Sequence, residues 1–105
     1  MSYPEIIKSL PAVDIPLNGV TAYLMQSPQN QLVFFSFEED TEIPKHSHGA
    51  QWGIVVEGKI ELSIGGELKT YCKGDTYYID EGVEHGGKIY AGFKAIDFFD
   101  DANRY

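Results

Sequence analysis

The chain contains three histidines, and their spacing indicates a metal site. His46 and His48 are separated by one residue, so on an extended chain both imidazoles project to the same face and can converge on one point. His85 lies in the turn-like sequence 82–87, directly after a predicted strand at 76–79. Imidazole is the commonest metal-binding side chain, and such a set suits Zn, Ni, Cu or Fe. The alternative is that these histidines lie at the surface or form hydrogen bonds within the core.

The segments that must position the histidines have the patterns of short strands. Residues 59–64 alternate polar and apolar side chains, and Gly65-Gly66 tolerates the positive φ angles of a two-residue turn, so 67–72 should return as a hairpin. Other strands are predicted at 20–26 and 31–37, which form another hairpin, and at 51–57, 76–79 and 93–99, with short pieces near 41–43 and 88–91.

Length and composition favour one all-β domain over residues 1–105. Aromatic residues make up 13% of the chain and eleven glycines punctuate it, a mix that favours many short strands. Pro4, Pro11 and Pro16 argue against a long helix at the start. About nine short strands in a small domain must hide their edges, which predicts a barrel or a two-sheet jelly roll.

Charge and cysteine content limit the partners and the setting. The formal charge is −8, and so acidic a surface repels nucleic acid and anionic membranes; we expect neither as a partner. Cys72 is the only thiol, which excludes an intramolecular disulfide, and we expect it to be a small buried residue without a catalytic role. With no signal peptide or spanning segment visible, a cytoplasmic location is the simplest expectation.

Two motifs in this sequence resemble those of the cupin superfamily. Pro44-Lys45-His46-Ser47-His48-Gly49-Ala50-Gln51, with six residues between Gln51 and Gly58, resembles the first motif, in which His-x-His precedes a Glu and then a Gly. Gly74-Asp75-Thr76-Tyr77-Tyr78-Ile79-Asp80-Glu81-Gly82-Val83-Glu84-His85 resembles the second, which ends in Pro-x-Gly, two residues and His. The motifs occur in this order, over 44–58 and 74–85, with a predicted hairpin between them.

The resemblance implies a double-stranded β-helix barrel that holds one metal ion in its mouth. Carried over residue by residue, His46, His48 and His85 would be metal ligands, and Gln51 takes the position of the Glu ligand. Strand parity alone places Gln51 on the opposite face from His46 and His48, and a bulge at Gly49-Ala50 would restore its direction.

A glutamine in place of a glutamate changes the charge of such a site. Three neutral imidazoles and a neutral amide leave a divalent ion its full charge, which strengthens its attraction for an anionic substrate. The same change weakens affinity for hard cations such as Mg or Mn. We therefore expect a divalent transition metal as cofactor, namely Zn, Ni, Fe or Cu.

Asp97 is a candidate for proton transfer or for orienting a ligand histidine, because it interrupts the apolar strand 93–99. The commoner situation for such a carboxylate is an outward-facing, solvated position, and that is the alternative we favour. Tyr77, Tyr78 and Tyr90 flank the second motif and are expected to pack on the barrel wall rather than line a pocket.

These features support a metal-dependent enzyme that acts on a small polar or anionic molecule, as an oxygenase, isomerase or lyase. One alternative is a non-catalytic module that binds a metal or small ligand, and another is a structural barrel with vestigial motif residues.

Small cupins form homodimers through their sheet faces, so the resemblance also implies a homodimer. The sequence carries more aromatic surface than one small barrel readily hides, and we expect it to be buried between subunits. The residues concerned are Phe34, Phe35, Phe37, Phe98 and Phe99, while Trp52 should pack between the sheets or at a subunit contact.

Overall fold

The computed structural model describes residues 1–105 and consists almost entirely of β-strands. Its one helical turn is α1 (Glu5–Lys8), and no helix is long and apolar enough to cross a membrane. The strands are β1 (Val20–Gln26), β2 (Gln31–Phe37), β3 (Thr41–His46), β4 (Gln51–Glu57), β5 (Lys59–Ile64), β6 (Glu67–Cys72), β7 (Thr76–Ile79), β8 (His85–Ile89) and β9 (Lys94–Phe99). The all-β prediction is confirmed.

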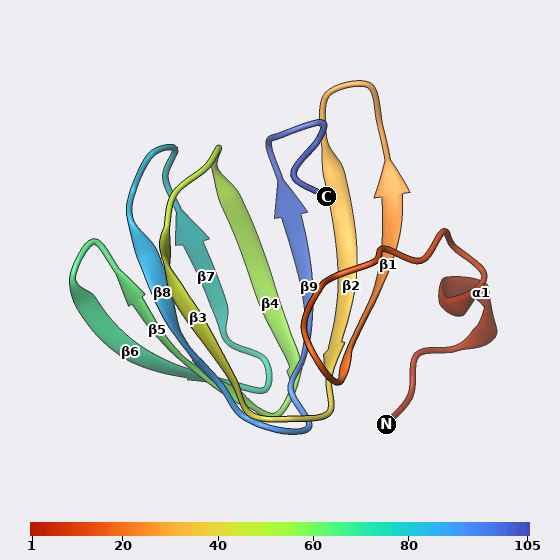
Figure 1. Ribbon diagram of the computed structural model, residues 1–105, viewed down its shortest axis with the longest axis horizontal. Helices are drawn as coiled ribbons and strands as arrows, with labels where there is room; N and C mark the ends of the chain where they lie inside the picture. Colours follow the sequence, from red (N-terminus) through yellow and green to blue (C-terminus); the bar gives the residue numbers. More distant parts are fainter.

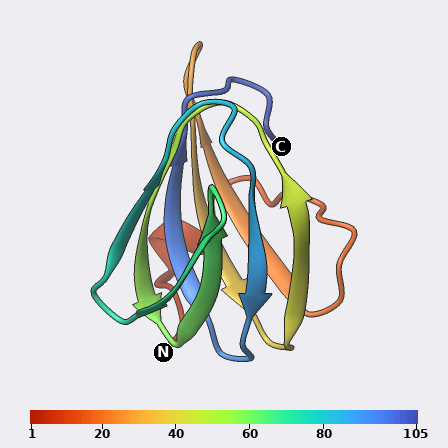
Figure 2. The same ribbon diagram turned by 90° about the vertical axis from the view of Figure 1, so that its left-hand side faces the viewer.

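The strands form two antiparallel sheets that face one another (Figures 1 and 2). One sheet has five strands in the order β1-β2-β9-β4-β7, and the other has four in the order β3-β8-β5-β6. The chain crosses between the sheets several times, so strands far apart in sequence lie side by side. This is the jelly-roll architecture that the strand count predicted.

Strand pairing extends two elements beyond their predicted limits. β3 continues to His46, and β8 begins at His85, although the sequence favoured a turn there. The two strands pair with each other, and His46 and His85 are partners in their ladder after an irregularity in register. Backbone hydrogen bonding to a distant strand therefore overrides the local turn signal of the glycines around His85.

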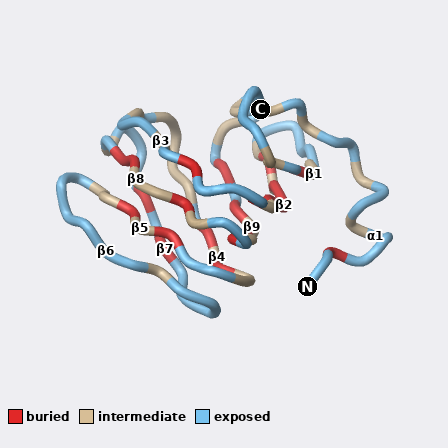
Figure 3. The backbone as a smooth tube through the Cα atoms, turned by 60° about the horizontal axis from the view of Figure 1, so that its bottom comes forward, coloured by how far each residue is buried: buried red, intermediate tan, exposed pale blue.

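The core lies between the sheets, and buried residues alternate with more exposed ones along several strands (Figure 3). Phe93, Phe99 and Ile79 are the largest fully buried side chains. The hairpin of β5 and β6 turns at Gly65 and Gly66, whose φ angles of 58° and 87° match the predicted two-residue turn.

Several expectations about side-chain burial were wrong. Four of the five phenylalanines expected at a subunit contact are buried within one chain, and only Phe98 is exposed. Trp52 is exposed on the outer face of the five-stranded sheet, so of its two expected positions the one between the sheets is wrong, and a subunit contact stays a prediction. Cys72 is exposed too, because it ends the edge strand β6, which is solvated along most of its length. A 105-residue jelly roll hides more aromatic surface than the sequence suggested.

Gly53 makes room for a buried pair of polar side chains. It lies in β4 opposite Tyr77 of β7 and Asp97 of β9, and a β-carbon at this position would collide with the Asp97 carboxylate and the Tyr77 ring. We predict that Gly53→Ala lowers the free energy of unfolding by about 1–3 kcal/mol through overpacking, as measured by urea denaturation. Gly66→Ala is the control, since its added carbon meets no neighbouring atom and reports only the cost of a positive φ. A Gly53→Ala protein as stable as the parent would show that position 53 has room for a β-carbon, contrary to the collision described here.

Candidate metal centre

The three histidines line one cavity between the sheets, at the end of the barrel where β3 ends and β8 begins, which is the upper end of these strands in Figure 1. β3 ends at His46, and the chain then crosses from the four-stranded to the five-stranded sheet through residues 47–50, which include His48. β8 begins at His85, next to the end of β3. The sequence predicted that both histidines of the first motif lie on one extended strand. Only His46 does, because His48 belongs to the crossover.

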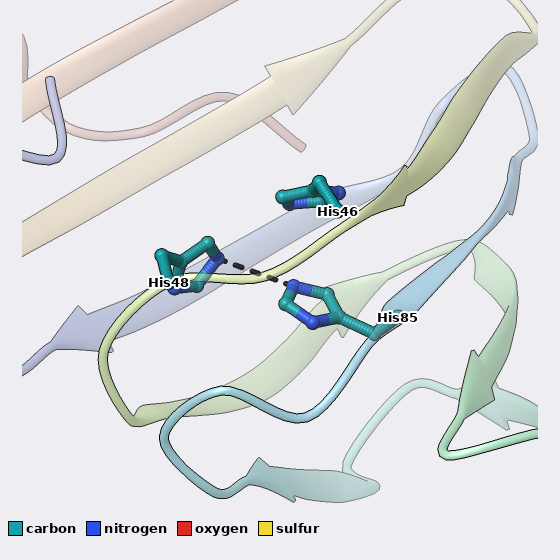
Figure 4. A group of neighbouring side chains, drawn as sticks. All are labelled: His46, His48 and His85. Carbon is teal, nitrogen blue, oxygen red and sulfur yellow. Dashed lines mark hydrogen bonds between the residues drawn. The ribbon is translucent and has the colours of Figure 1, made fainter.

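The imidazoles point toward one another (Figure 4). One nitrogen from each ring can be chosen such that all three lie within 4.8 Å of one another. The ring centroid of His46 is 4.3 Å from that of His85 and 5.2 Å from that of His48. Nε2 of His48 and Nε2 of His85 are 3.2 Å apart. His85 is buried, whereas His46 and His48 are half-buried toward the opening.

Each imidazole is oriented by a carbonyl of its own chain segment. Nδ1 of His46 lies 2.9 Å from the carbonyl oxygen of Pro44, and Nδ1 of His85 lies 2.9 Å from that of Val83. Nδ1 of His48 lies 2.8 Å from the carbonyl oxygen of Gly49. Because a carbonyl oxygen only accepts hydrogen bonds, each Nδ1 must donate, which leaves the lone pair of a neutral imidazole on Nε2.

This donor set fits a divalent transition metal. At metal–nitrogen distances of about 2.0–2.1 Å, two adjacent imidazole ligands have their nitrogens roughly 3.0–3.4 Å apart. The Nε2 atoms of His48 and His85 already have that separation. Two lone pairs so close repel unless a cation or a proton lies between them. The carbonyl bonds to Nδ1 are the outer contacts that usually orient metal-binding histidines.

The surroundings favour the neutral, metal-binding form of two of these rings. Burial lowers the pKa of His48 and of His85 and outweighs the opposing effect of their carbonyl hydrogen bonds. Arg104 and His46 lower both pKa values further, His48 also lowers that of His85, and Asp101 has a smaller opposing effect on His48. Both rings therefore remain deprotonated on Nε2 near neutral pH.

Gln51 lines the same cavity as the three histidines, although simple strand parity placed it on the opposite face. The parity count fails because residues 47–50 form a crossover between two sheets, not the bulged strand that we considered. Nε2 of Gln51 donates to Oδ1 of Asp97 at 3.3 Å, which leaves the amide oxygen free to accept or to coordinate.

Asp97 lies inside the barrel, so the favoured alternative of an outward-facing, solvated carboxylate was wrong. It is 4% exposed and lines the cavity with Gln51 and Tyr77. Tyr77 donates its hydroxyl to Oδ1 of Asp97 at 2.6 Å, so this tyrosine also lines the pocket, contrary to expectation. Burial raises the pKa of Asp97 from 3.8 to about 6, against the lowering effect of both hydrogen bonds. Such a carboxyl group can exchange a proton near neutral pH.

The cavity has a volume of about 560 Å³ and combines a polar mouth with apolar walls. Phenylalanine, isoleucine and leucine side chains from both sheets form the walls. The polar side chains are few, and they are His46, Ser47, His48, His85, Gln51, Asp97, Tyr77, Arg104 and Tyr105. A largely apolar cavity with a few convergent polar groups is typical of a small-molecule site.

Sequence reasoning missed Arg104, which belongs to the C-terminal segment 100–105. It lines the cavity, no carboxylate lies within ion-pair distance of it, and its buried Nε has no hydrogen-bond partner. Its guanidinium lies 4.6 Å from the ring centroid of Tyr105. The one available signal was that Arg104 is the only arginine of an acidic chain, but no spacing relates it to either motif.

Hydrogen bonds hold the C-terminal segment at the cavity. The buried side chain of Gln31 donates from Nε2 to the carbonyl oxygen of Tyr105 and accepts from its backbone N–H, both at 2.9 Å. Gln26 donates to the carbonyl oxygen of Ala102 at 2.8 Å, and Asp101 accepts from the backbone N–H of Gly49 at 2.8 Å. Arg104 thus has a defined position although its segment has no regular secondary structure.

The buried charge of Asp97 should lower the stability of the metal-free protein. Its pKa is higher in the folded than in the unfolded chain, so the contribution of Asp97 to stability is greatest below pH 3.8, declines as pH rises through 6, and is lost above that value. We predict that Asp97→Asn raises the free energy of unfolding at pH 8 by about 1–3 kcal/mol, a gain that shrinks at pH 4. Urea denaturation of the parent and the variant at pH 8 and at pH 4 measures this difference in the free energy of unfolding. An equal gain at both pH values would contradict the burial of a titrating carboxyl group.

The fold and the sequence both match known proteins. A family model described as "Cupin domain" matches residues 33–92. An RmlC-like cupin from Shewanella frigidimarina NCIMB 400 superposes with a TM-score of 0.81 at 25% identity, covering 92% of this chain and 88% of that chain. KdgF from Halomonas sp. superposes with a TM-score of 0.77 at 23% identity, covering 92% and 90%.

A larger protein contains the same fold as one part of its chain. Oxalate decarboxylase from Bacillus subtilis superposes with a TM-score of 0.77 at 18% identity, with 94% of this chain but 29% of that chain covered. No curated protein sequence matches.

Because the family model spans more than half of the chain and its match contains both histidine motifs, this protein belongs to the cupin family.

Proposed function

We propose that this cupin binds one divalent transition metal through His46, His48 and His85, with Gln51 as a fourth ligand, and acts on a small anionic molecule. The observation that carries the proposal is the set of three Nδ1–H groups held by backbone carbonyls, which directs three Nε2 lone pairs into one cavity. Structural histidines have no need of this shared orientation.

The neutral donor set supports Zn, Ni, Fe or Cu as the metal. The Mn(II) centres of Bacillus subtilis oxalate decarboxylase show that a related barrel binds a transition metal, at 18% identity to this chain. When bound, a divalent ion would polarise a substrate oxygen or supply a coordination site for water or O₂.

Arg104 supports an anionic substrate. An arginine that lines a cavity without a carboxylate partner can form two parallel hydrogen bonds to a carboxylate or phosphate group. Arg104 lines the same cavity as His48 and His85 and lowers their pKa values, which supports binding of an anion beside the imidazoles. The apolar walls of the cavity would lower the local dielectric constant and so strengthen that contact.

Asp97 supports a catalytic role over simple binding. Its carboxyl group is buried in the cavity, and its pKa of about 6 lets it accept or donate a proton near neutral pH. Tyr77 holds Oδ1, and the pKa of the Tyr77 hydroxyl is raised by burial and by Asp97, so Tyr77 stays protonated as a hydrogen-bond donor. Proton transfer beside a Lewis acid suits an isomerase or lyase, and the same cavity could admit O₂ for an oxygenase.

The metal assignment predicts which substitutions abolish binding. His46→Ala and His85→Ala should each weaken Zn²⁺ or Ni²⁺ binding by about 100-fold or more, because each removes an oriented imidazole. Gln51→Ala should have a smaller effect, about tenfold. Isothermal titration calorimetry measures these losses, with Tyr78→Phe on the outer face as control. Unchanged binding in either histidine variant would refute the proposed ligand set.

The anion assignment predicts a preference that depends on Arg104. In the Zn²⁺-loaded protein, acetate should bind more tightly than the similarly sized neutral acetamide. Arg104→Gln should reduce this preference about tenfold or more while the Kd for Zn²⁺ stays within a few-fold of the parent value. Competition calorimetry measures both the preference for acetate over acetamide and the Kd for Zn²⁺. A variant that keeps the full preference for acetate would show that the metal alone selects the anion.

A further inference from the structure

The crossover that carries His48 has no strand partner. Residues 47–50 lie outside the ladders of both sheets. Two of their backbone carbonyls are held by distant N–H groups: that of His48 accepts from the backbone of Gly82, and that of Ala50 accepts from the backbone of Asp100, both at 2.9 Å. These two bonds fix the flanks of the crossover and leave the residue between them, at position 49, to be held by something else.

Gly49 is held by a side chain of the C-terminal segment. Its backbone N–H donates to Oδ2 of Asp101 at 2.8 Å, while its carbonyl oxygen accepts from Nδ1 of His48, also at 2.8 Å. The carbonyl that orients His46 belongs instead to Pro44, within β3. A glycine has no side chain to restrict its dihedral angles, so outside contacts must fix the direction of its carbonyl. Asp101 supplies that contact.

Asp101 lies so close to Gly49 that a side chain at this position would collide with it. The three nearest neighbours of an added β-carbon would be Oδ1, Cγ and Oδ2 of Asp101, at 2.5, 2.7 and 2.7 Å. Gly49 is not among the glycines with a positive φ, so an alanine can adopt the same backbone conformation. The missing side chain thus serves the approach of the carboxylate and not a special turn.

The Asp101 carboxylate is well placed to hold a backbone group. It is half-buried, and no lysine or arginine lies within ion-pair distance of it, so the Gly49 N–H has no cationic competitor. A hydrogen bond from an N–H to an ionised carboxylate is about twice as strong as one between neutral groups. Gln26 and Gln31 anchor the C-terminal segment independently, so the carboxylate keeps its position without help from the crossover.

We infer that Asp101 is a positioning residue of the metal centre: it fixes Gly49, whose carbonyl selects the metal-binding tautomer of His48. The inference rests on the proposed function, because it takes His48 to be a metal ligand. Asp101 and Arg104 belong to the same C-terminal segment, so one support positions both an imidazole and the guanidinium of the cavity. Contacts that orient ligands from outside commonly change metal affinity by about 10–100-fold.

Calorimetric titration of the full chain with Zn²⁺ tests the inference. Asp101→Ala should weaken Zn²⁺ binding about tenfold or more, because Gly49 and the His48 ring are no longer fixed. Asp101→Asn should stay within about threefold of the parent, since an amide oxygen still accepts from the Gly49 N–H. Asp100→Ala is the matched control. It removes an equal charge that is bonded to Asn30 instead, and solvent screening should keep its Kd within about threefold of the parent value.

Gly49→Ala disturbs the same contact from the other side. In the parent it should weaken Zn²⁺ binding about tenfold or more, because the added carbon displaces the carboxylate. In the Asp101→Ala background it should have little further effect, since the three nearest atoms are gone. Non-additive losses identify two residues that act through one contact, and losses that multiply would overturn the inference.

The tautomer of His48 provides a readout that needs no metal. Nitrogen NMR of the metal-free protein shows whether Nδ1 of an imidazole carries a proton. Nδ1 of His48 should be protonated in the parent and in Asp101→Asn, and partly unprotonated in Asp101→Ala, where the Gly49 carbonyl is free to turn away. Nδ1 of His85, which donates to the carbonyl of Val83, is the internal control and should not change.

Several outcomes would overturn the inference. One is an Asp101→Ala protein that binds Zn²⁺ as tightly as the parent, and another is an Asp101→Asn protein as weak as Asp101→Ala, since charge alone would then matter. A parent that binds no Zn²⁺ would refute the proposed metal site, and the Nδ1 signal of His48 would then decide the inference by itself.

The variants should keep the parent's far-ultraviolet circular dichroism spectrum, because Gln26 and Gln31 still anchor the C-terminal segment. Should Asp101→Ala unfold, Gly49→Ala must still lose Zn²⁺ affinity and change the Nδ1 signal of His48. Failure of Gly49→Ala to do either would equally overturn the role of Asp101.

Discussion

The candidate site depends on one repeated interaction, a hydrogen bond from Nδ1 of an imidazole to a backbone carbonyl one or two residues away. The bond is local, so each histidine carries its own orienting group. What is not local is the convergence of the three Nε2 atoms, which requires β3, β8 and the crossover between the sheets to meet at one end of the barrel. The local hydrogen bonds therefore fix the tautomer of each imidazole, and the two-sheet fold fixes the distances between the three Nε2 atoms.

The inner walls of β4 and β9 provide the second part of the site. Gln51 and Asp97 face the cavity and bond to each other, and Tyr77 from β7 completes the group. Gly53 has no side chain where these groups need space. Enclosing a carboxyl group there opposes folding at neutral pH, because burial raises its pKa. A buried acid that reduces stability but faces a cavity is typical of a group retained for chemistry.

The inner and outer faces of β4 and β9 carry different kinds of side chain. Gln51 and Asp97 point inward and line the cavity, while their neighbours Trp52 and Phe98 point outward and are exposed, so one-residue alternation confines the candidate site to one side of the sheet. The C-terminal segment completes the cavity from outside the sheets and adds its only guanidinium, on Arg104.

The sequence by itself determined the elements and the chemistry of the motifs. Alternating apolar residues and glycine turns predicted most strand positions, and the spacing of His46, His48 and His85 predicted a metal-binding cluster, because periodicity and turn preference are local properties. Tertiary structure alone decided which face Gln51 and Asp97 occupy, since a crossover between sheets interrupts the parity count and a carboxylate's burial depends on strands far away in sequence. It likewise decided the position of Arg104 and the burial of most phenylalanines. Those outcomes depend on which distant strands become neighbours, and no short stretch of sequence contains that information.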